Sequence, residues 1–189
     1  MRLSAISLSV LFLFTAQAQA QTAPDSKAAP VVAEQPKPVD ALIVSQVTDL
    51  IEAHHTIPNA EAWQKIGPQA GIVLRQIAQD GKRLATRRAR AATALRFFPA
   101  TDAVGLLTKM VADDALATPI RASAASSLAV LGGGEAVATL SAVLSSESMR
   151  VREGMIKALA ESKAPEARAA LSAHGKVEQK AFLKKEIEK

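Results

Sequence analysis

The chain has 189 residues, a length that suits one domain with a tail. Hydrophobic residues make up 49% of it but aromatic residues only 3%, so the apolar mass is Ala, Leu, Val and Ile, which favours closely packed helices over sheets. The formal net charge of +5 is compatible with anionic partners but does not require nucleic acid.

The first twenty residues have the pattern of a secretory signal peptide. Arg2 precedes an almost wholly apolar stretch from Leu3 to Phe14, and Ala18-Gln19-Ala20 is a small-x-small cleavage site. A retained membrane anchor is the alternative, but the apolar core is short for a hydrocarbon layer of roughly 30 Å. We therefore expect cleavage after residue 20 and a periplasmic or secreted protein, which argues further against nucleic acid as a partner. The chain has no Cys, so export brings no disulfide framework and no lipid-modified cysteine.

Residues 21–39 are expected to form a disordered linker. They contain four of the nine prolines among Ala, Gln and Lys, and no apolar periodicity. A spacer without a role of its own is favoured over a binding segment.

The pattern of capping residues in residues 40–66 predicts an N-terminal helical cap. Asp40 is a good N-cap for a helix that ends around His54-His55. Asn59 is placed to cap a second, short helix that stops at Gly67-Pro68. That helix carries Trp63, which is interpreted as the plug of the cap rather than an exposed anchor for a partner.

From residue 67 the sequence repeats itself. Each unit contains an apolar helix, a polar turn and a second helix that opens near an arginine, and one such pair cannot enclose its own apolar face, so successive pairs must stack. The helices are expected to stop at Pro99, at a flexible turn over Gly132–Gly134, and before Pro165. The residues in register are Leu74, Leu107 and Leu140 in the first helices, with Arg88, Arg121 and Arg152, then Leu95, Leu128 and Leu159, in the second helices.

A fourth unit begins at Pro165 and ends in a charged helix from about Val177 to Lys189. This helix is predicted to close the stack with Phe182, Leu183 and Ile187 packed inward. Residues 67–189 therefore read as the repeat region with its capping helix.

The pattern resembles HEAT repeats, in particular the short bacterial kind found in phycobilisome-lyase-like proteins. The stretches that carry the resemblance are Ile120-Arg121 and Val151-Arg152, each followed by Ala-rich positions and a Leu, and Arg87-Arg88 in a first repeat that lacks the apolar residue before the arginine. The resemblance covers about residues 67–172. It implies an all-α fold, a right-handed α-solenoid of stacked antiparallel helix pairs with about three full repeats plus helical caps.

Three arginines recur at the start of the second helices. A cation there faces the positive end of the helix dipole and needs a carboxylate. Asp80 and Asp113, eight residues before Arg88 and Arg121, are the expected partners, while the turn before Arg152 offers Ser146 and Glu147. As the resemblance implies, such pairs would form a structural ladder between adjacent repeats, in preference to a ligand-binding series.

The densest basic cluster surrounds the first of these arginines. Helical spacing places Arg83, Arg87 and Arg90 on one face. The simpler interpretation is a helix face exposed to solvent. The more specific one is a binding face for an acidic protein, anionic lipid head groups or a cell-wall polymer.

Neither a metal site nor catalysis is expected. His54 and His55 are adjacent and diverge on a helix, His174 stands alone, and no metal-binding spacing occurs. No nucleophile motif, phosphate loop or carboxylate pair occurs either. We therefore expect an exported, non-catalytic interaction scaffold or adaptor that needs no cofactor and binds a protein partner. The alternatives are a cofactor-lyase-like or enzyme-accessory protein, and a structural envelope protein that binds anionic surfaces weakly.

Overall fold

The computed structural model describes residues 39–53 and 58–189, which belong to one compact unit. The predicted signal peptide and residues 21–38 of the predicted linker lie outside the described residues, as do His54 and His55. The domain boundaries drawn from the sequence therefore stay predictions.

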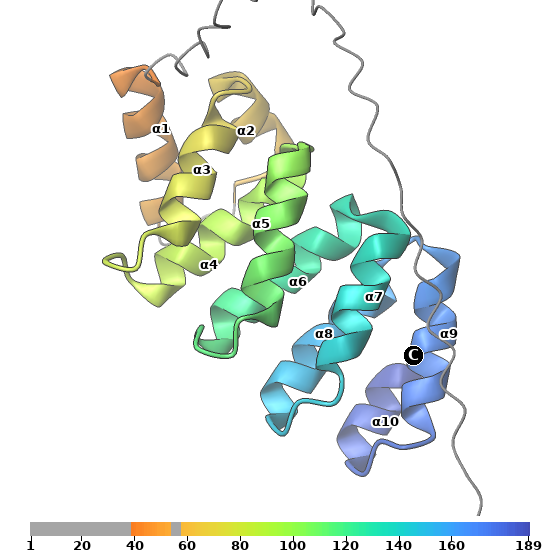
Figure 1. The fold of residues 1–189 in the computed structure, drawn as a ribbon. Coiled ribbons are helices and arrows are strands. Elements are labelled where there is room, and N and C mark those ends of the chain that lie inside the picture. Colours follow the sequence, from red (N-terminus) through yellow and green to blue (C-terminus); the bar gives the residue numbers. More distant parts are fainter. Residues whose placement is uncertain (1–38, 54–57) are drawn as a thin grey trace, which may run out of the picture. The chain divides into compact units, whose positions relative to one another are not determined.

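The described residues form ten α-helices and one short 3-10 helix, with no strand among them (Figure 1). The prediction of an all-α fold is thus confirmed. In chain order the elements are α1 (Ala41–Glu52), α2 (Ala60–Ile66), α3 (Ala70–Gln79), α4 (Ala85–Ala94), η1 (Leu95–Phe97), α5 (Thr101–Ala112), α6 (Thr118–Leu131), α7 (Gly133–Val143), α8 (Met149–Glu161), α9 (Pro165–Gly175) and α10 (Ala181–Ile187).

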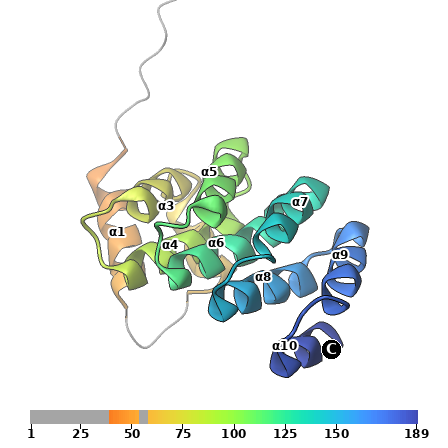
Figure 2. The same ribbon diagram turned by 60° about the horizontal axis from the view of Figure 1, so that its bottom comes forward.

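Four helix pairs, α3–α4, α5–α6, α7–α8 and α9–α10, follow one another along a stack (Figures 1 and 2). We call α3, α5, α7 and α9 the first layer and α4, α6 and α8 the second layer. Within the second layer, α6 packs against both α4 and α8, and α10 packs against α8. This is the predicted solenoid of antiparallel pairs, and only its right-handed sense stays a prediction.

The core runs through the stack between the two layers. The repeat leucines of both helices in each unit are at most 1% exposed, because they occupy the positions that face the neighbouring layer. Alanine fills many of the remaining core positions, which lets the helix axes approach closely. Helices α6 and α8 are close at Gly154 of α8, where an added Cβ would lie 3.0 Å from the Cβ of Ala122 in α6.

The N-terminal helices begin as predicted. The Asp40 carboxylate accepts the backbone N–H of Leu42 at 2.9 Å, and the Asn59 side chain accepts that of Ala62 at 3.0 Å. Trp63 is 1% exposed and packs edge-on against Phe98, so its predicted role as a plug is confirmed.

Two features differ from the sequence interpretation. The glycines after α6 do not form a flexible turn, because α7 already begins at Gly133, which takes a φ of +52°. The charged C-terminal helix is shorter than predicted, and Phe182 in it is 54% exposed, while Leu183 is buried and Ile187 partly buried. The prediction that Phe182 packs inward is wrong because α10 turns only one narrow face to α8 and α9.

Candidate interaction surface

The three repeat arginines hold the turn inside each helix pair. Arg88 Nε donates to the Ala78 carbonyl at 3.0 Å, and Arg121 Nε donates to the Val111 carbonyl at 3.0 Å. Arg152 Nη1 donates to the carbonyls of Ser146 and Glu147 at 2.8 and 3.1 Å. The last carbonyls of a helix have no partner within it and carry the negative end of its dipole, so the guanidinium groups of Arg88 and Arg121 satisfy both needs. Arg152 binds carbonyls of the turn that follows α7 instead.

The predicted carboxylate partners are wrong. Among the described contacts, Asp80 accepts the N–H of Lys82 and Asp113 accepts that of Ala115, each within its own turn. Arg121 instead pairs with the next residue, Asp114, at 2.7 Å. Aspartate at the first position of a turn satisfies the backbone two residues on, which removes it from the arginine.

Arg152 also carries the link between the last two repeats. Its Nε and Nη2 donate to the two carboxylate oxygens of Glu178, at 2.9 and 3.2 Å. His174 Nε2 lies 3.1 Å from the same carboxylate, and the backbone N–H groups of Gln179 and Lys180 donate to it at 2.9 Å each. Glu178 is 3% exposed, so this is a buried, fully bonded charge network.

This environment lowers the pKa of Glu178 from 4.5 to about 2, chiefly through the hydrogen bonds from Arg152 and against the opposing effect of burial. The sequence interpretation missed Glu178. A signal existed, because an acidic residue follows the repeat leucine by seven positions in three units, as Asp114, Glu147 and Glu178. The network is bonded on every side and holds α9 and α10 against α8.

The three arginines of the predicted basic face are engaged within the chain. Arg87 forms an ion pair with Glu52 of α1 at 3.3 Å, and Arg83 pairs with Asp80 at 3.4 Å. Arg90 donates to the Leu50 carbonyl at 3.4 Å. Arg87 and Arg90 fasten α1 to the first repeat, whereas Arg83 pairs within the turn between α3 and α4. Binding of an anionic partner by these three side chains stays a prediction.

The outward side of the second layer carries a line of polar contacts across successive repeats. Ser126 of α6 donates to the Glu161 carboxylate of α8 at 2.6 Å, and Arg96 of η1 contacts both side chains. One turn earlier in α8, Lys157 pairs with Glu153 at 2.6 Å. We call this the second-layer face, formed by Ala122, Ser123, Ser126, Glu153, Lys157 and Glu161.

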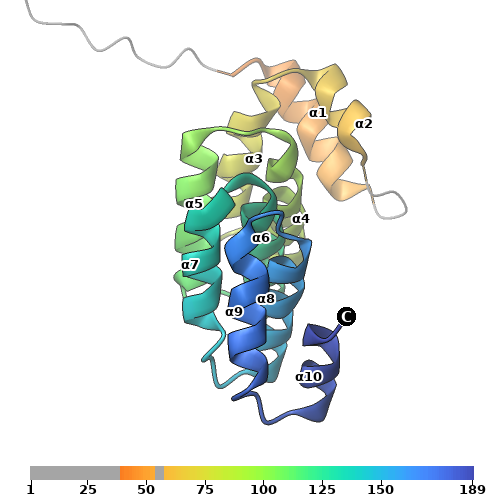
Figure 3. The same ribbon diagram turned by 90° about the vertical axis from the view of Figure 1, so that its right-hand side faces the viewer.

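The second-layer face is mainly polar, with short side chains on α6 and longer charged ones on α8. In Figure 3, α1 and α2 at the top and α10 at the bottom project on the side of the second layer, so the face is flanked at both ends. Ser126 and Glu161 join the two helices through a hydrogen bond, and Lys157 and Glu153 pair along α8. A surface of this kind is suited to recognising a partner by shape and charge.

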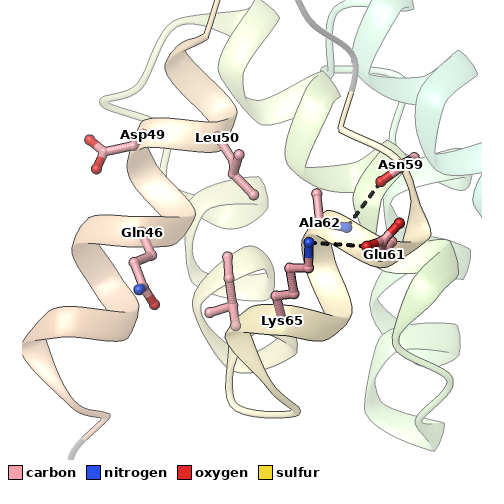
Figure 4. Close-up of a pocket in the computed structure, with 8 residues that line it drawn as sticks. Gln46, Asp49, Leu50, Asn59, Glu61, Ala62 and Lys65 are labelled. Atoms are coloured by element: carbon pink, nitrogen blue, oxygen red, sulfur yellow. Dashed lines mark hydrogen bonds and ion pairs between the residues drawn. The ribbon is translucent and has the colours of Figure 1, made fainter.

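A hollow of about 500 Å³ lies between α1 and α2 (Figure 4). Leu50, Ala62 and Ile66 line it together with Asp49, and Lys65 pairs with Glu61 at its rim, at 3.0 Å. No cluster of His, Asp or Glu with the arrangement of a metal site occurs among the described residues. Within the same residues, no helix is long and apolar enough to cross a membrane.

Comparison with known proteins agrees with this architecture. Residues 116–188, which run from the turn before α6 to the end of α10, match the family model described as HEAT repeats. No curated protein matches the chain.

Proposed function

The chain is a HEAT-repeat protein, matched to the family over residues 116–188, and we propose that it is an exported, non-catalytic adaptor that binds a protein partner. Stacked helical repeats commonly mediate protein–protein interactions, because they offer extended surfaces built from successive equivalent helices. Fold alone does not fix function, so the argument must come from the surface.

The observation that carries the proposal is the second-layer face. Its polar contacts cross from η1 to α6 and from α6 to α8, so its side chains are ordered before any partner arrives. A preorganised surface loses less side-chain entropy on binding. Gly154 and Ala122 let α8 approach α6 closely, so the two helices form one continuous surface.

The state of the titratable groups supports a binding function over a catalytic one. The one carboxylate–histidine–arginine cluster among the described residues, around Glu178, is buried and its oxygens are saturated with donors. Such a group is held in its charged form and takes part in stabilising the stack rather than in proton transfer.

Export rests on residues 1–20, whose charge, apolar core and Ala18-Gln19-Ala20 site have the pattern of a signal peptide. Mass spectrometry of the protein isolated from its own organism tests this part. We expect the first residue to be Gln21, in an envelope or secreted fraction. A protein that retains Met1 in the cytoplasmic fraction would contradict export and leave the adaptor proposal standing.

The adaptor proposal is tested by affinity capture with two matched double variants. Ser123→Glu with Lys157→Glu alters the second-layer face, and Gln76→Glu with Lys109→Glu makes the same charge change on exposed positions of the first layer. We expect the wild type and the first-layer variant to retain one stoichiometric protein partner, and the second-layer variant to lose it. Equal retention by both variants would overturn the assignment of the face.

A further inference from the structure

The two ends of the stack each leave a hollow where a further helix pair would pack. At the N-terminal end it is the hollow between α1 and α2, which Figure 4 shows with the remaining helices behind it. At the C-terminal end a hollow of about 410 Å³ lies between α9 and α10, on the end of the stack that faces the viewer in Figure 3. An interior repeat has both of its sides covered by neighbours, but a terminal repeat does not.

Both hollows have apolar residues in their lining. Leu50 and Ile66 line the N-terminal one, and Leu171 and Ile187 line the C-terminal one. Leu42 of α1 is 61% exposed and lies one helical turn before Gln46, which lines the N-terminal hollow. An exposed leucine beside one hollow supplies an apolar side chain of a size that the opposite hollow can take up.

The charges at the two ends are of opposite sign. Asp49 and Glu61 line the N-terminal hollow, and Lys65, the only cation among the described residues that line it, is paired with Glu61. Arg168, Lys176 and Lys184 line the C-terminal hollow, with Glu188 as the one acidic residue. Opposite potentials on two surfaces favour their encounter and fix their relative orientation.

We propose that copies of this chain associate head to tail, with the α9–α10 end of one copy docked on the α1–α2 end of the next. The stack would then continue from copy to copy, and each added copy would leave the same two ends free. A head-to-tail contact that does not close on itself produces open chains instead of a fixed dimer. The association is distinct from partner binding at the second-layer face, because it uses the ends of the stack.

Charge reversal at either end tests the proposal. The C-end variant carries Arg168→Glu with Lys184→Glu, and the N-end variant carries Asp49→Lys with Glu61→Lys. All four side chains are on the surface, so both variants should fold, which circular dichroism melting checks. Lys82→Glu with Lys109→Glu is the control, because it makes the charge change of the C-end variant away from both hollows.

Sedimentation velocity of the purified chain measures the outcome. We expect the wild type and the control to form larger species as concentration rises, and high salt to reverse this. Each end variant alone should stay monomeric, because both of its ends then carry charge of the same sign. An equimolar mixture of the two should form larger species again, because the unaltered ends of the two variants match and their reversed ends are also opposite in charge.

Three results would overturn the proposal. A wild type that stays monomeric at every concentration in low salt has no such contact. End variants that associate as well as the wild type would place the contact elsewhere, and a monomeric mixture of folded variants would remove the pairing of the two ends.

Discussion

Arg121 shows at the level of one residue how a repeat motif acts in this molecule. It is 4% exposed, and its guanidinium joins the end of α5, at the Val111 carbonyl, to the start of α6. Removing it leaves that carbonyl without its donor, and hydrogen bonds to charged groups contribute about 1.5–3 kcal/mol each. The series Arg88, Arg121 and Arg152 is therefore a repeated fastening of one helix to the next.

We predict that Arg121→Ala lowers the free energy of unfolding by about 2–3 kcal/mol, measured by urea denaturation. A double-mutant cycle of Arg121 with Asp114 should show a coupling energy, while the same cycle with Asp113 should show none. An unchanged stability together with lost partner binding would make Arg121 a binding residue. Coupling to Asp113 in place of Asp114 would restore the partner expected from the sequence.

Glu178 should make the free energy of unfolding depend on pH in the acidic range. Its folded-state pKa of about 2 lies below the ordinary 4.5, so its contribution is complete above about pH 4.5 and is lost as the pH falls toward 2. We expect Glu178→Gln to be less stable than the wild type at pH 7, by urea denaturation, and the difference to shrink through this range. A difference that stays constant from neutral pH down to pH 3 would contradict the charged network.

Whether a contact could be predicted from the sequence depended on how far apart its two partners lie along the chain. The repeat leucines were found because burial follows from helical spacing, and Asp40 and Asn59 because caps act within one turn. The carboxylate partners were misassigned because Asp113 and Asp114 are adjacent and only the turn geometry decides which one meets Arg121. Glu178 was missed because its partner Arg152 lies in the preceding repeat, 26 positions earlier in the chain.

At the level of the elements, the close approach of α6 and α8 decides which glycines can be replaced. Gly154 faces Ala122 at a distance that leaves little space for a side chain, whereas nothing lies within 4 Å of a Cβ added at Gly105 of α5. Both are inside helices, where glycine costs about 1 kcal/mol relative to alanine.

We predict opposite effects at these two positions. Gly105→Ala should raise the free energy of unfolding by about 0.5–1 kcal/mol, because it restores helix propensity without a contact. Gly154→Val should lower it by about 1–3 kcal/mol, because the added methyl groups force α8 away from α6. Thermal melts of the two variants beside the wild type measure both. A neutral Gly154→Val would mean that the two helices are not packed as closely as described.

The ends of elements were the hardest to predict from the sequence. Helical periodicity marks the middle of a helix well, but three glycines could equally form a loop or open a helix. The structure uses Gly133 at positive φ to start α7 almost directly after α6. Phe182 was assigned to the core on its residue type, whereas in α10 it points away from the face that Leu183 turns inward.

At the scale of the whole molecule, the stack of helix pairs has separate surfaces for the two proposed interactions, with a partner and with further copies of the chain. The second-layer face lies across α6 and α8 of two successive repeats, and the two ends carry opposite charges around apolar hollows. A partner bound across α6 and α8 would also hold those repeats together, since repeat stability depends on contacts between neighbours. The proposed adaptor role and the proposed head-to-tail contact use different surfaces and are therefore compatible in one assembly.

The measurement that tests the adaptor role most directly is site-specific photo-crosslinking in the protein's own organism. A photoreactive residue placed at Ser123 or Lys157 samples the second-layer face, and one at Gln76 or Lys109 samples the first layer. We predict that one protein partner crosslinks from Ser123 and Lys157 and not from the two first-layer positions. Crosslinks from the first layer alone, or from none of the four positions, would contradict binding through the second-layer face.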